Sequence, residues 1–248
     1  MKAMITGASS GIGRDMARIL SEKGYDLILV ARRKNRLEEL KESLHTNVTI
    51  IPMDISSTYN CMKLYNKVKD DDIEILVNNA GFGLYGEFAS TKLESELDMV
   101  DLNIKATHLL TKLFLNDFMK KNHGYILNVA SIAGFMPGPM MATYYATKSY
   151  VLKLTEAIIY ELKKAKSDVY VGCLCPGPVD TEFNKVADVK FNMTSKSSFY
   201  VAKYAINKMF NKKHIIVPGL TIKIFRFFTK ILPNSLLVKI IYEAQDRR

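Results

Sequence analysis

The 248 residues carry 35 lysines and arginines against 25 aspartates and glutamates, a formal net charge of +10 at pH 7. The hydrophobic fraction of 48% and the charged fraction of 24% exclude a disordered or fibrous chain. The basic residues are scattered, with no aromatic-interleaved basic motif, so we expect no nucleic-acid binding. Their excess then points to an anionic cofactor or an anionic membrane surface.

The chain is predicted to form one domain, 1–248, because no internal repeat and no linker-like stretch divides it. Met1–Thr6 already has the composition of a strand, which leaves no room for a targeting segment. Three cysteines do not make a disulfide framework, and Cys173 and Cys175 are expected to be buried, reduced thiols. No histidine cluster accompanies them, so no metal is expected. These features predict a cytoplasmic protein.

Short apolar runs alternate along the chain with segments whose apolar residues follow helical spacing. The expected strands are Ala3–Thr6, Leu27–Ala31, Val48–Pro52, Ile73–Asn78, Tyr125–Ala130, Val169–Cys175 and His214–Val217. The expected helices include Ile12–Lys23, Lys34–Leu44, Ser57–Lys69, Glu94–Phe118 and Thr143–Lys166. This alternation predicts an α/β fold, a single Rossmann-type doubly wound parallel sheet of about seven strands with helices on both faces. Functional side chains are then expected just after the strands.

The first expected strand leads into a glycine-rich turn and a helix. Thr6–Gly13 has the pattern T-G-x-x-x-G-x-G. Its glycines let the backbone turn tightly and approach a pyrophosphate, which would rest on the amide groups at the helix start. The predicted cofactor contacts in this turn are Gly7, Ser9, Ser10, Gly11, Ile12 and Gly13.

The residues after the second strand discriminate between the two nicotinamide cofactors. An NAD-binding sheet usually places a carboxylate there for the ribose hydroxyls, but Ala31 is followed by Arg32 and Arg33. Guanidinium groups bind a 2′-phosphate through charge-assisted bonds, whereas a carboxylate would repel it. We therefore expect NADP(H). The alternative is that both arginines only solvate the start of the next helix.

Polar and small residues also follow the third and fourth strands. Asp54 and Ile55 would suit the adenine amino group and ring face, and Asn79, Ala80 and Gly81 would let the backbone approach the adenine ribose. An Asp or Asn at a strand end is otherwise a helix cap or a turn former. The matching positions along successive strands favour the cofactor interpretation.

A Tyr-x-x-x-Lys pair lies beyond the fifth strand. Tyr144 and Lys148 would share one helix face, and Ser131 follows the strand more closely. A tyrosine of ordinary pKa, about 10, is a slow base at neutral pH, but a neighbouring ammonium and a positive nicotinamide ring favour the phenolate. We expect a lowered pKa for Tyr144, which would then donate or accept a proton while Ser131 holds the carbonyl oxygen.

Together with the glycine turn, this arrangement resembles the short-chain dehydrogenase/reductase family over roughly the whole chain. The resemblance implies that Tyr144 is the proton donor or acceptor and that Ser131 orients the substrate. It implies that Lys148 binds the nicotinamide ribose and that Asn103 holds a water linking this lysine to solvent. An Asn in the middle of a helix is otherwise unfavourable.

The family resemblance also implies cofactor and subunit contacts further along the chain. The stretch after the sixth strand would contact the nicotinamide carboxamide, and its predicted cofactor residues are Pro176, Gly177, Val179 and Thr181. Family members usually associate through the helices expected here at Glu94–Phe118 and Thr143–Lys166, so a homodimer or homotetramer is expected. Tyr145 is out of register with the lysine and is interpreted as a packing residue.

The substrate cleft is expected to be apolar. Its predicted lining is Phe82, Tyr85, Phe135, Met136, Pro137, Met140 and Met141. Residues 181–198, which contain Phe183 and Phe191, would form a lid. Such a lining suits a hydrophobic small molecule such as a ketone, a 3-oxoacyl compound or a steroid-like carbonyl. The alternative is core packing, with methionines filling gaps.

The C-terminal segment, residues 219–248, is amphipathic and basic. Leu220–Leu232 is apolar with Lys223, Arg226 and Lys230 on one helical face, but no run is long enough to span a membrane. This segment is expected to cover the cleft or pack on another subunit. Peripheral contact with an anionic membrane is the alternative.

These observations predict an NADPH-dependent oxidoreductase that transfers hydride between nicotinamide and a carbonyl or secondary alcohol. NADPH favours reduction, because cells typically keep that cofactor reduced. Three alternatives stay open: an alcohol dehydrogenase that works in the oxidative direction, a non-catalytic NADP-binding sensor, and a membrane-surface scaffold acting through residues 219–248.

Overall fold

The protein is built on a single seven-stranded sheet whose paired strands are all parallel, in the order β3-β2-β1-β4-β5-β6-β9. This computed structural model describes residues 1–183, 187 and 195–245. The strands are β1 (Lys2–Thr6), β2 (Asp26–Ala31), β3 (Val48–Pro52), β4 (Ile73–Asn78), β5 (Tyr125–Val129), β6 (Tyr170–Leu174) and β9 (Ile215–Ile216). The predicted fold class and strand number are confirmed.

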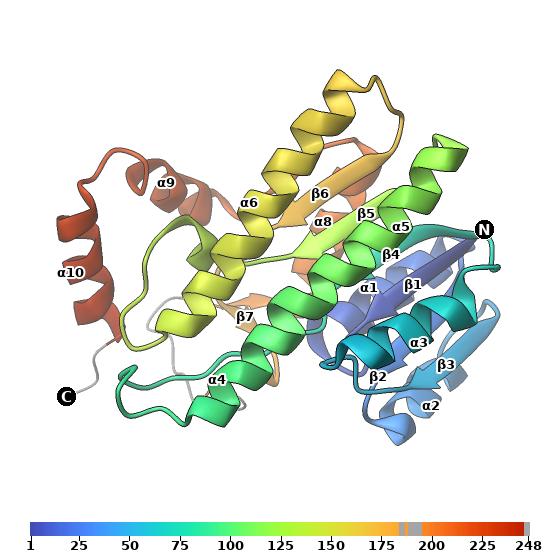
Figure 1. Cartoon of the computed structure of the whole chain (residues 1–248), viewed down its shortest axis with the longest axis horizontal. Helices are drawn as coiled ribbons and strands as arrows, with labels where there is room; N and C mark the ends of the chain where they lie inside the picture. The colour runs from blue at the N-terminus through green and yellow to red at the C-terminus, as the bar shows by residue number, and fades with distance from the viewer. Residues whose placement is uncertain (184–186, 188–194, 246–248) are drawn as a thin grey trace.

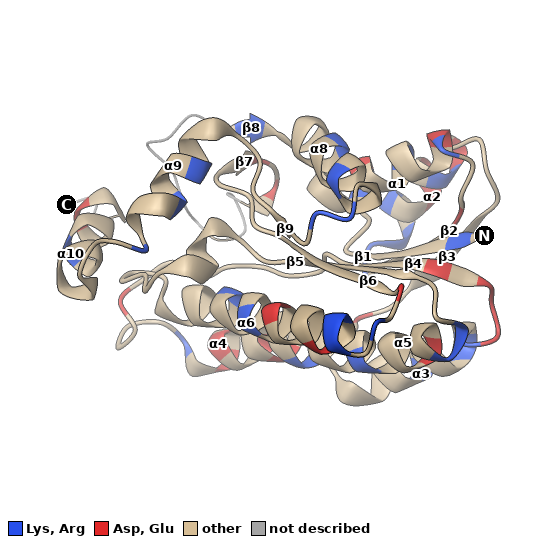
Figure 2. Cartoon of the chain, turned by 90° about the horizontal axis from the view of Figure 1, so that it is seen from above, with Lys and Arg blue, Asp and Glu red and all other residues tan. Residues whose placement is uncertain are grey.

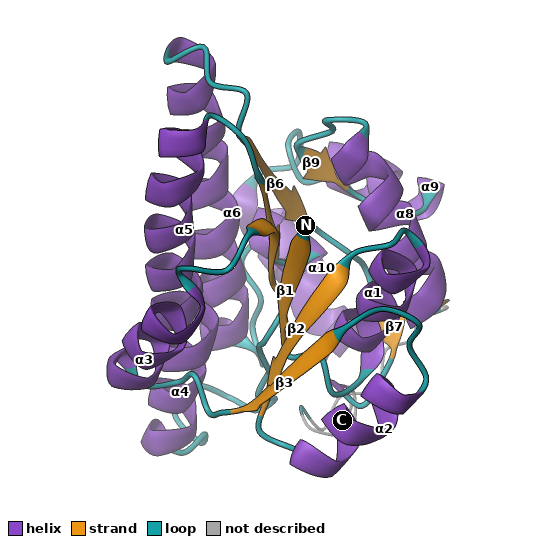
Figure 3. Cartoon of the chain, turned by 90° about the vertical axis from the view of Figure 1, so that its right-hand side faces the viewer, coloured by secondary structure: helices purple, strands orange, loops and turns teal. Residues whose placement is uncertain are grey.

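Helices cover both faces of this sheet, as Figure 3 shows. One face carries α1 (Gly11–Glu22), α2 (Lys34–Glu42) and α8 (Ser198–Phe210), and the other α3 (Thr58–Val68), α4 (Leu93–Val100), α5 (Thr107–Lys121) and α6 (Ala142–Lys164). A separate core packs on each face, one containing Met16, Leu20 and Ile206 and the other Leu64, Phe114 and Ile158. Burial on both sides explains why the strands are nearly continuous runs of apolar residues.

The strand order changes direction between β1 and β4, since β2 and β3 lie on one side of β1 and the later strands on the other. Loops that follow β1 and β4 therefore diverge and leave a crevice at the carboxyl ends of the strands. Parallel pairing places Thr6 beside Val30, and Asn78 beside Asn128. The segments that follow these strands consequently meet at one edge of the sheet.

The helix expected at Glu94–Phe118 is interrupted, and this is the main departure from the predicted elements. Residues Asp101–Ala106 form a π-helical segment, η1, between α4 and α5. A wider turn of this kind is frequent at functional sites, and it contains Asn103. The unfavourable mid-helix asparagine is therefore not in a regular α-helix.

The last two helices, α9 (Leu220–Phe228) and α10 (Asn234–Gln245), extend beyond one end of the sheet (Figure 1). A short strand β7 (Val179–Asp180) precedes the predicted lid and pairs with β8 (Lys196–Ser197), which lies inside it. Most of that lid, including Phe191, lies outside the described residues. Lysines and arginines are spread over the helices on both faces of the sheet (Figure 2). No helix in the described ranges is both long and apolar enough to cross a membrane.

Candidate active site

One cavity of about 530 Å³ runs along the carboxyl edge of the sheet. It joins the glycine turn to the predicted catalytic residues. The predicted site residues that line it are Gly7, Ser9, Ser10, Gly11, Ile12, Arg32, Arg33, Asp54, Ile55, Asn79, Ala80, Gly81, Ser131, Tyr144, Lys148, Pro176, Gly177, Val179 and Thr181. Gly13 and Asn103 lie behind the wall and act on it indirectly.

The glycine turn depends on its missing side chains. Gly7 and Gly11 have positive φ angles of 65° and 53°, which other residues rarely adopt. A Cβ on Gly13 would lie 2.5 Å from the carbonyl oxygen of Gly7, so glycine there lets α1 pack against the turn. Thr6 Oγ1 accepts hydrogen bonds from the backbone N–H groups of Asn79 and Ala80, at 3.0 and 3.1 Å. The segments after β1 and β4 are thus fixed to each other.

The start of α1 is arranged to receive an anion. The side chain of its N-cap residue, Ser10, makes no capping hydrogen bond within the described part of the chain. First-turn amide groups of a helix lack intrahelical partners and carry partial positive charge. Gly11 and Ile12 of this first turn line the cavity, so the turn fits the pyrophosphate of a dinucleotide.

Tyr144 stands in the first turn of α6, where its ring is 8% exposed. A side-chain hydrogen bond joins it to Ser131, which caps the short helix η2 (Ile132–Phe135). Burial raises the pKa of Tyr144 above its ordinary value, and the bond to Ser131 opposes this rise. Among the chain's own groups, desolvation has the largest influence on this pKa, and the expected lowering does not arise from them without the positive nicotinamide ring.

Lys148 lies one turn further along α6 and is 6% exposed. Burial lowers the pKa of its ammonium group to about 8. Its Nζ donates to the carbonyl oxygen of Val129 at 3.0 Å and lies 5.8 Å from the ring centroid of Tyr144.

The thiols of Cys173 and Cys175 are buried and free, as predicted, with their sulfurs 3.8 Å apart.

Asn103 ties the π-helical segment to the loop after β4. Its Oδ1 accepts from the N–H of Phe82 at 3.1 Å, and its Nδ2 donates to the carbonyl of Phe82 at 2.9 Å. Nδ2 also lies 3.1 Å from Oγ1 of Thr147, the neighbour of Lys148. A Cβ on Gly81 would come within 2.7 Å of Asn103 Oδ1, so glycine is needed for this approach. Asn103 therefore positions the backbone around Lys148.

The far end of the cavity is charged and open to water. Arg32 and Arg33 are 74% and 44% exposed in their side chains. Arg32 Nη1 lies 3.8 Å from Asp54 Oδ2, and Arg33 Nη2 donates to the hydroxyls of Ser9 and Ser10, at 3.0 Å each. Arg33 and the two serines thus form one hydrogen-bonded group at this end, and Arg32 lines the same end beside Asp54.

The apolar wall of the cavity agrees only in part with the predicted cleft. Phe82, Tyr85, Met136 and Met141 line it, together with Phe183. Phe135, Pro137 and Met140 are not among its lining residues, and the prediction for these three is wrong. Phe135 instead packs beneath the guanidinium of Arg226, 4.5 Å from its ring centroid.

Helices α9 and α10 supply wall residues that the sequence did not single out: Ile222, Phe225, Ile240, Ile241, Ala244 and Gln245. Gln245 Nε2 donates to the Tyr145 hydroxyl at 2.6 Å, and the Tyr85 hydroxyl donates to the Gln245 carbonyl at 2.8 Å. Tyr145 packs against two buried apolar clusters, as predicted, and it also lines the cavity. The only sequence signal for these contacts was the apolar character of the two helices.

The fold, the glycine turn and the buried Ser-Tyr-Lys set define a dinucleotide-binding oxidoreductase. A short chain dehydrogenase family model matches residues 1–192. This chain therefore belongs to the short-chain dehydrogenase/reductase family, and the predicted membership is confirmed.

Relatives and solved structures agree with this assignment. An uncharacterized oxidoreductase of Staphylococcus epidermidis is 35% identical over 188 residues, 75% of this chain and 81% of that protein. A very-long-chain 3-oxoacyl-CoA reductase of Pyrenophora tritici-repentis is 33% identical over 196 residues, 74% of this chain and 56% of that protein. A short-chain dehydrogenase from Sphingobium yanoikuyae in complex with NADPH has a TM-score of 0.84 at 27% identity, covering 95% of this chain and 94% of that one.

Proposed function

We propose that this chain is an NADPH-dependent reductase of hydrophobic carbonyl compounds, with Tyr144 as the proton donor. The observation that carries the proposal is the single cavity, which has Arg32 and Arg33 at one end and Tyr144, Ser131 and Lys148 at the other. When bound, NADPH supplies the hydride that adds to the carbonyl carbon. The likeness to an NADPH-bound family structure is consistent with this cofactor.

The protein groups at the buried end would complete the reduction. Ser131 can donate a hydrogen bond to the carbonyl oxygen and hold it beside the Tyr144 hydroxyl. As negative charge develops on that oxygen, Tyr144 donates its proton and an alcohol results. Because burial raises the pKa of Tyr144, the phenol is protonated at neutral pH, which suits proton donation better than abstraction. Lys148 supplies positive charge beside the phenolate that is left.

The cofactor assignment rests on the charged end. A 2′-phosphate placed between Arg33 and Arg32 would meet guanidinium groups and the hydroxyls of Ser9 and Ser10. The carboxylate of Asp54 lies near Arg32, but it follows β3 rather than β2, where an NAD-binding carboxylate usually stands.

The substrate class follows from the apolar part of the cavity wall, which includes residues of helices α9 and α10. Phe82, Met136, Phe225 and Ile241 make this part of the cavity apolar, as a ketone with bulky apolar groups or a 3-oxoacyl compound would require. The similarity to a fungal 3-oxoacyl-CoA reductase supports including acyl compounds. The competing functions are alcohol oxidation with NADP⁺ and cofactor sensing without turnover.

A panel assay separates these functions. Loss of the absorbance of reduced nicotinamide is followed with steroid ketones, 3-oxoacyl thioesters, aldehydes and diketones, each with NADPH and with NADH. We expect turnover of one class, with NADPH preferred. Turnover only of alcohols with NADP⁺ would favour the dehydrogenase, and measurable NADPH binding without any turnover would favour the sensor.

Association into a homodimer or homotetramer is part of the proposal. Helices α5 and α6 lie side by side on one face of the molecule in Figures 1 and 3. Large apolar side chains on the helices of this face are exposed, including Leu97 at 53% and Tyr160 at 60%. Light scattering after gel filtration measures the mass, and a monomer at micromolar concentration would contradict the expectation.

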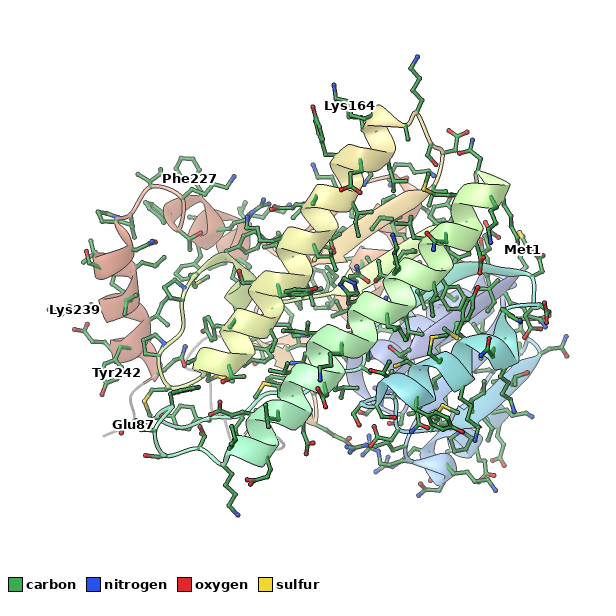
Figure 4. All side chains as sticks on the ribbon, in the orientation of Figure 1. Met1, Glu87, Lys164, Phe227, Lys239 and Tyr242 are labelled. Atoms are coloured by element: carbon green, nitrogen blue, oxygen red, sulfur yellow. The ribbon has the colours of Figure 1, made fainter. Side chains whose placement is uncertain are left out.

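Peripheral membrane contact through residues 219–248 stays a prediction, as does a cytoplasmic location. Leu220, Ile224 and Phe227 of α9 are exposed, as is Ile231 just beyond this helix, and Phe227 and Lys239 lie at the outer edge in Figure 4. Flotation with vesicles of anionic and of neutral lipid tests the contact. Flotation with anionic vesicles that Phe227→Ser abolishes would support it, and no flotation of the unaltered chain would contradict it. Arg247 and Arg248 lie outside the described residues.

A further inference from the structure

The anion-binding end of the cavity already holds a carboxylate of the chain. Glu182 Oε2 lies 2.8 Å from Arg33 Nη1, and Glu182 Oε1 lies 3.9 Å from Arg36 Nη2. The same Arg33 guanidinium donates to the hydroxyls of Ser9 and Ser10. These groups hold the pKa of Glu182 below its usual range, with the hydrogen bond from Arg33 as the largest cause. Glu182 thus already occupies one of the Arg33 donors that a phosphate monoester would need.

The place of Glu182 is set by its two neighbours in the chain. The Thr181 side chain lies against the glycine turn, since a Cβ on Gly11 would come within 2.9 Å of Thr181 Cγ2. The ring of Phe183 packs on Tyr144, with the centroids 5.3 Å apart. The three-residue stretch therefore touches the cofactor turn on one side and the catalytic tyrosine on the other, and Glu182 lines the cavity between them.

We propose that Glu182 is a cofactor-specificity residue that competes with the 2′-phosphate of NADPH for Arg33. This inference rests on the proposed NADPH dependence. A phosphate carries more negative charge than a carboxylate and has three acceptor oxygens, so it can displace Glu182 from the guanidinium. A ribose hydroxyl has neither advantage, and NADH would leave the Glu182–Arg33 pair in place. Glu182 therefore weakens the binding of NADPH more than that of NADH.

The competition has a consequence for cofactor exchange. When NADP⁺ leaves after turnover, Glu182 can pair with Arg33 again. The guanidinium therefore keeps an anionic partner when the 2′-phosphate is released. The pair is partly exposed, with both side chains between 40% and 44% accessible, so its contribution is modest and screened by salt. A large change in affinity is not expected from it.

The experiment compares the dissociation constants of NADPH and NADH for the unaltered chain, Glu182→Gln and Glu38→Gln, measured by nicotinamide fluorescence. Glu38 pairs with Lys34 on the nearby helix α2 at 3.4 Å, and its substitution makes the same charge change without touching the cavity. For Glu182→Gln we expect about fivefold tighter NADPH binding, the equivalent of one exposed ion pair, and less than about twofold change for NADH. Glu38→Gln should change neither constant by more than about twofold.

A second variant shows whether the effect passes through the arginine. In an Arg33→Ala background, Glu182→Gln should no longer favour NADPH, because the shared partner is gone. Weaker NADPH binding by Glu182→Gln, or an equal gain for both cofactors, would overturn the competition and leave the proposed function standing. Failure of the unaltered chain to bind NADPH at all would overturn both.

Discussion

The end of the cavity with Tyr144 and Lys148 is shielded from water, whereas the end with Arg32 and Arg33 is exposed to it. We propose that the two ends have different functions for this reason. Tyr144 and Lys148 are 8% and 6% exposed, and desolvation is the largest cause of both pKa shifts. The side chains of Arg32 and Arg33 are 74% and 44% exposed and meet carboxylates whose attraction water and salt screen. Under the proposed function, burial sets the protonation of the groups that carry out the chemistry, whereas the exposed charges would select the cofactor without contributing to the proton transfer.

The largest effect is expected at the buried end. Tyr144→Phe removes the proton donor but keeps the ring that packs on Phe183, so turnover should fall by about 10²–10⁴-fold while NADPH binding changes little. Steady-state rates and fluorescence titration measure the two quantities. Tyr160→Phe, an exposed position on the same helix, should keep full activity. Substantial turnover by Tyr144→Phe would contradict the assigned role.

The next effect belongs to the exposed end and should appear in binding instead of rate. Replacing both Arg32 and Arg33 by Ala removes the charge-assisted bonds to the 2′-phosphate, and NADPH should bind about 10–100-fold more weakly. NADH, which lacks this phosphate, should change by less than about threefold. Lys34→Ala with Lys41→Ala removes two charges from the following helix, α2, as a control. An equal loss for both cofactors would show that the arginines act only through general charge.

Asn103 tests whether the buried end depends on its supporting hydrogen bonds. Asn103→Leu would leave the N–H and carbonyl of Phe82 without these partners, which should lower the free energy of unfolding by about 1–3 kcal/mol. Turnover should fall more than NADPH affinity, since Lys148 loses its positioned neighbour Thr147. Thermal unfolding and kinetics report the two effects. Asn103→Asp keeps the acceptor for Phe82 and should be intermediate; full activity in Asn103→Leu would refute the positioning role.

The last effect is a dependence of stability on pH, which does not involve catalysis. Lys148 has an ordinary pKa of 10.5, lowered by burial to about 8 in the folded chain. Between these two pKa values the unfolded chain binds more protons than the folded chain, so the free energy of unfolding rises with pH. Below pH 8 the folded chain has to bury a charged ammonium, and the full cost of that burial lowers its stability. The stability of the unaltered chain relative to Lys148→Met should therefore rise by up to about 1.4 kcal/mol per pH unit between pH 8 and 10. Urea unfolding measures it, and a flat difference would mean that Lys148 is not desolvated.

The sequence contained enough information for the sheet and for most of the cavity wall. Tyr144 and Lys148 are one helical turn apart, and the glycine turn is contiguous, so local spacing is sufficient to predict their placement. The sequence did not predict that burial raises the pKa of Tyr144 in the chain without cofactor, because the number of atoms that exclude water from a ring depends on packing. The seven strands were apolar enough to identify by composition alone.

Contacts between residues that are far apart in the sequence could not be predicted from the spacing of residues along the chain. Glu182 meets Arg33, and Gln245 meets Tyr145, only because the chain folds these segments together. Asn103 was singled out by its unusual setting, but the π-helical turn that aims it at Phe82 depends on long-range hydrogen bonds. Phe135 was wrongly assigned to the cleft, since only the position of α9 shows that Arg226 covers it.

The most direct test of the central claim follows the hydride itself. NADPH carrying deuterium at both hydrogen positions of its reduced nicotinamide carbon is incubated with the chain and the best carbonyl substrate of the panel, and the alcohol is analysed by mass spectrometry. The account predicts one deuterium on the former carbonyl carbon, with no labelled alcohol formed by Tyr144→Phe. Alcohol without deuterium, or NADPH binding with no alcohol from any substrate, would contradict it.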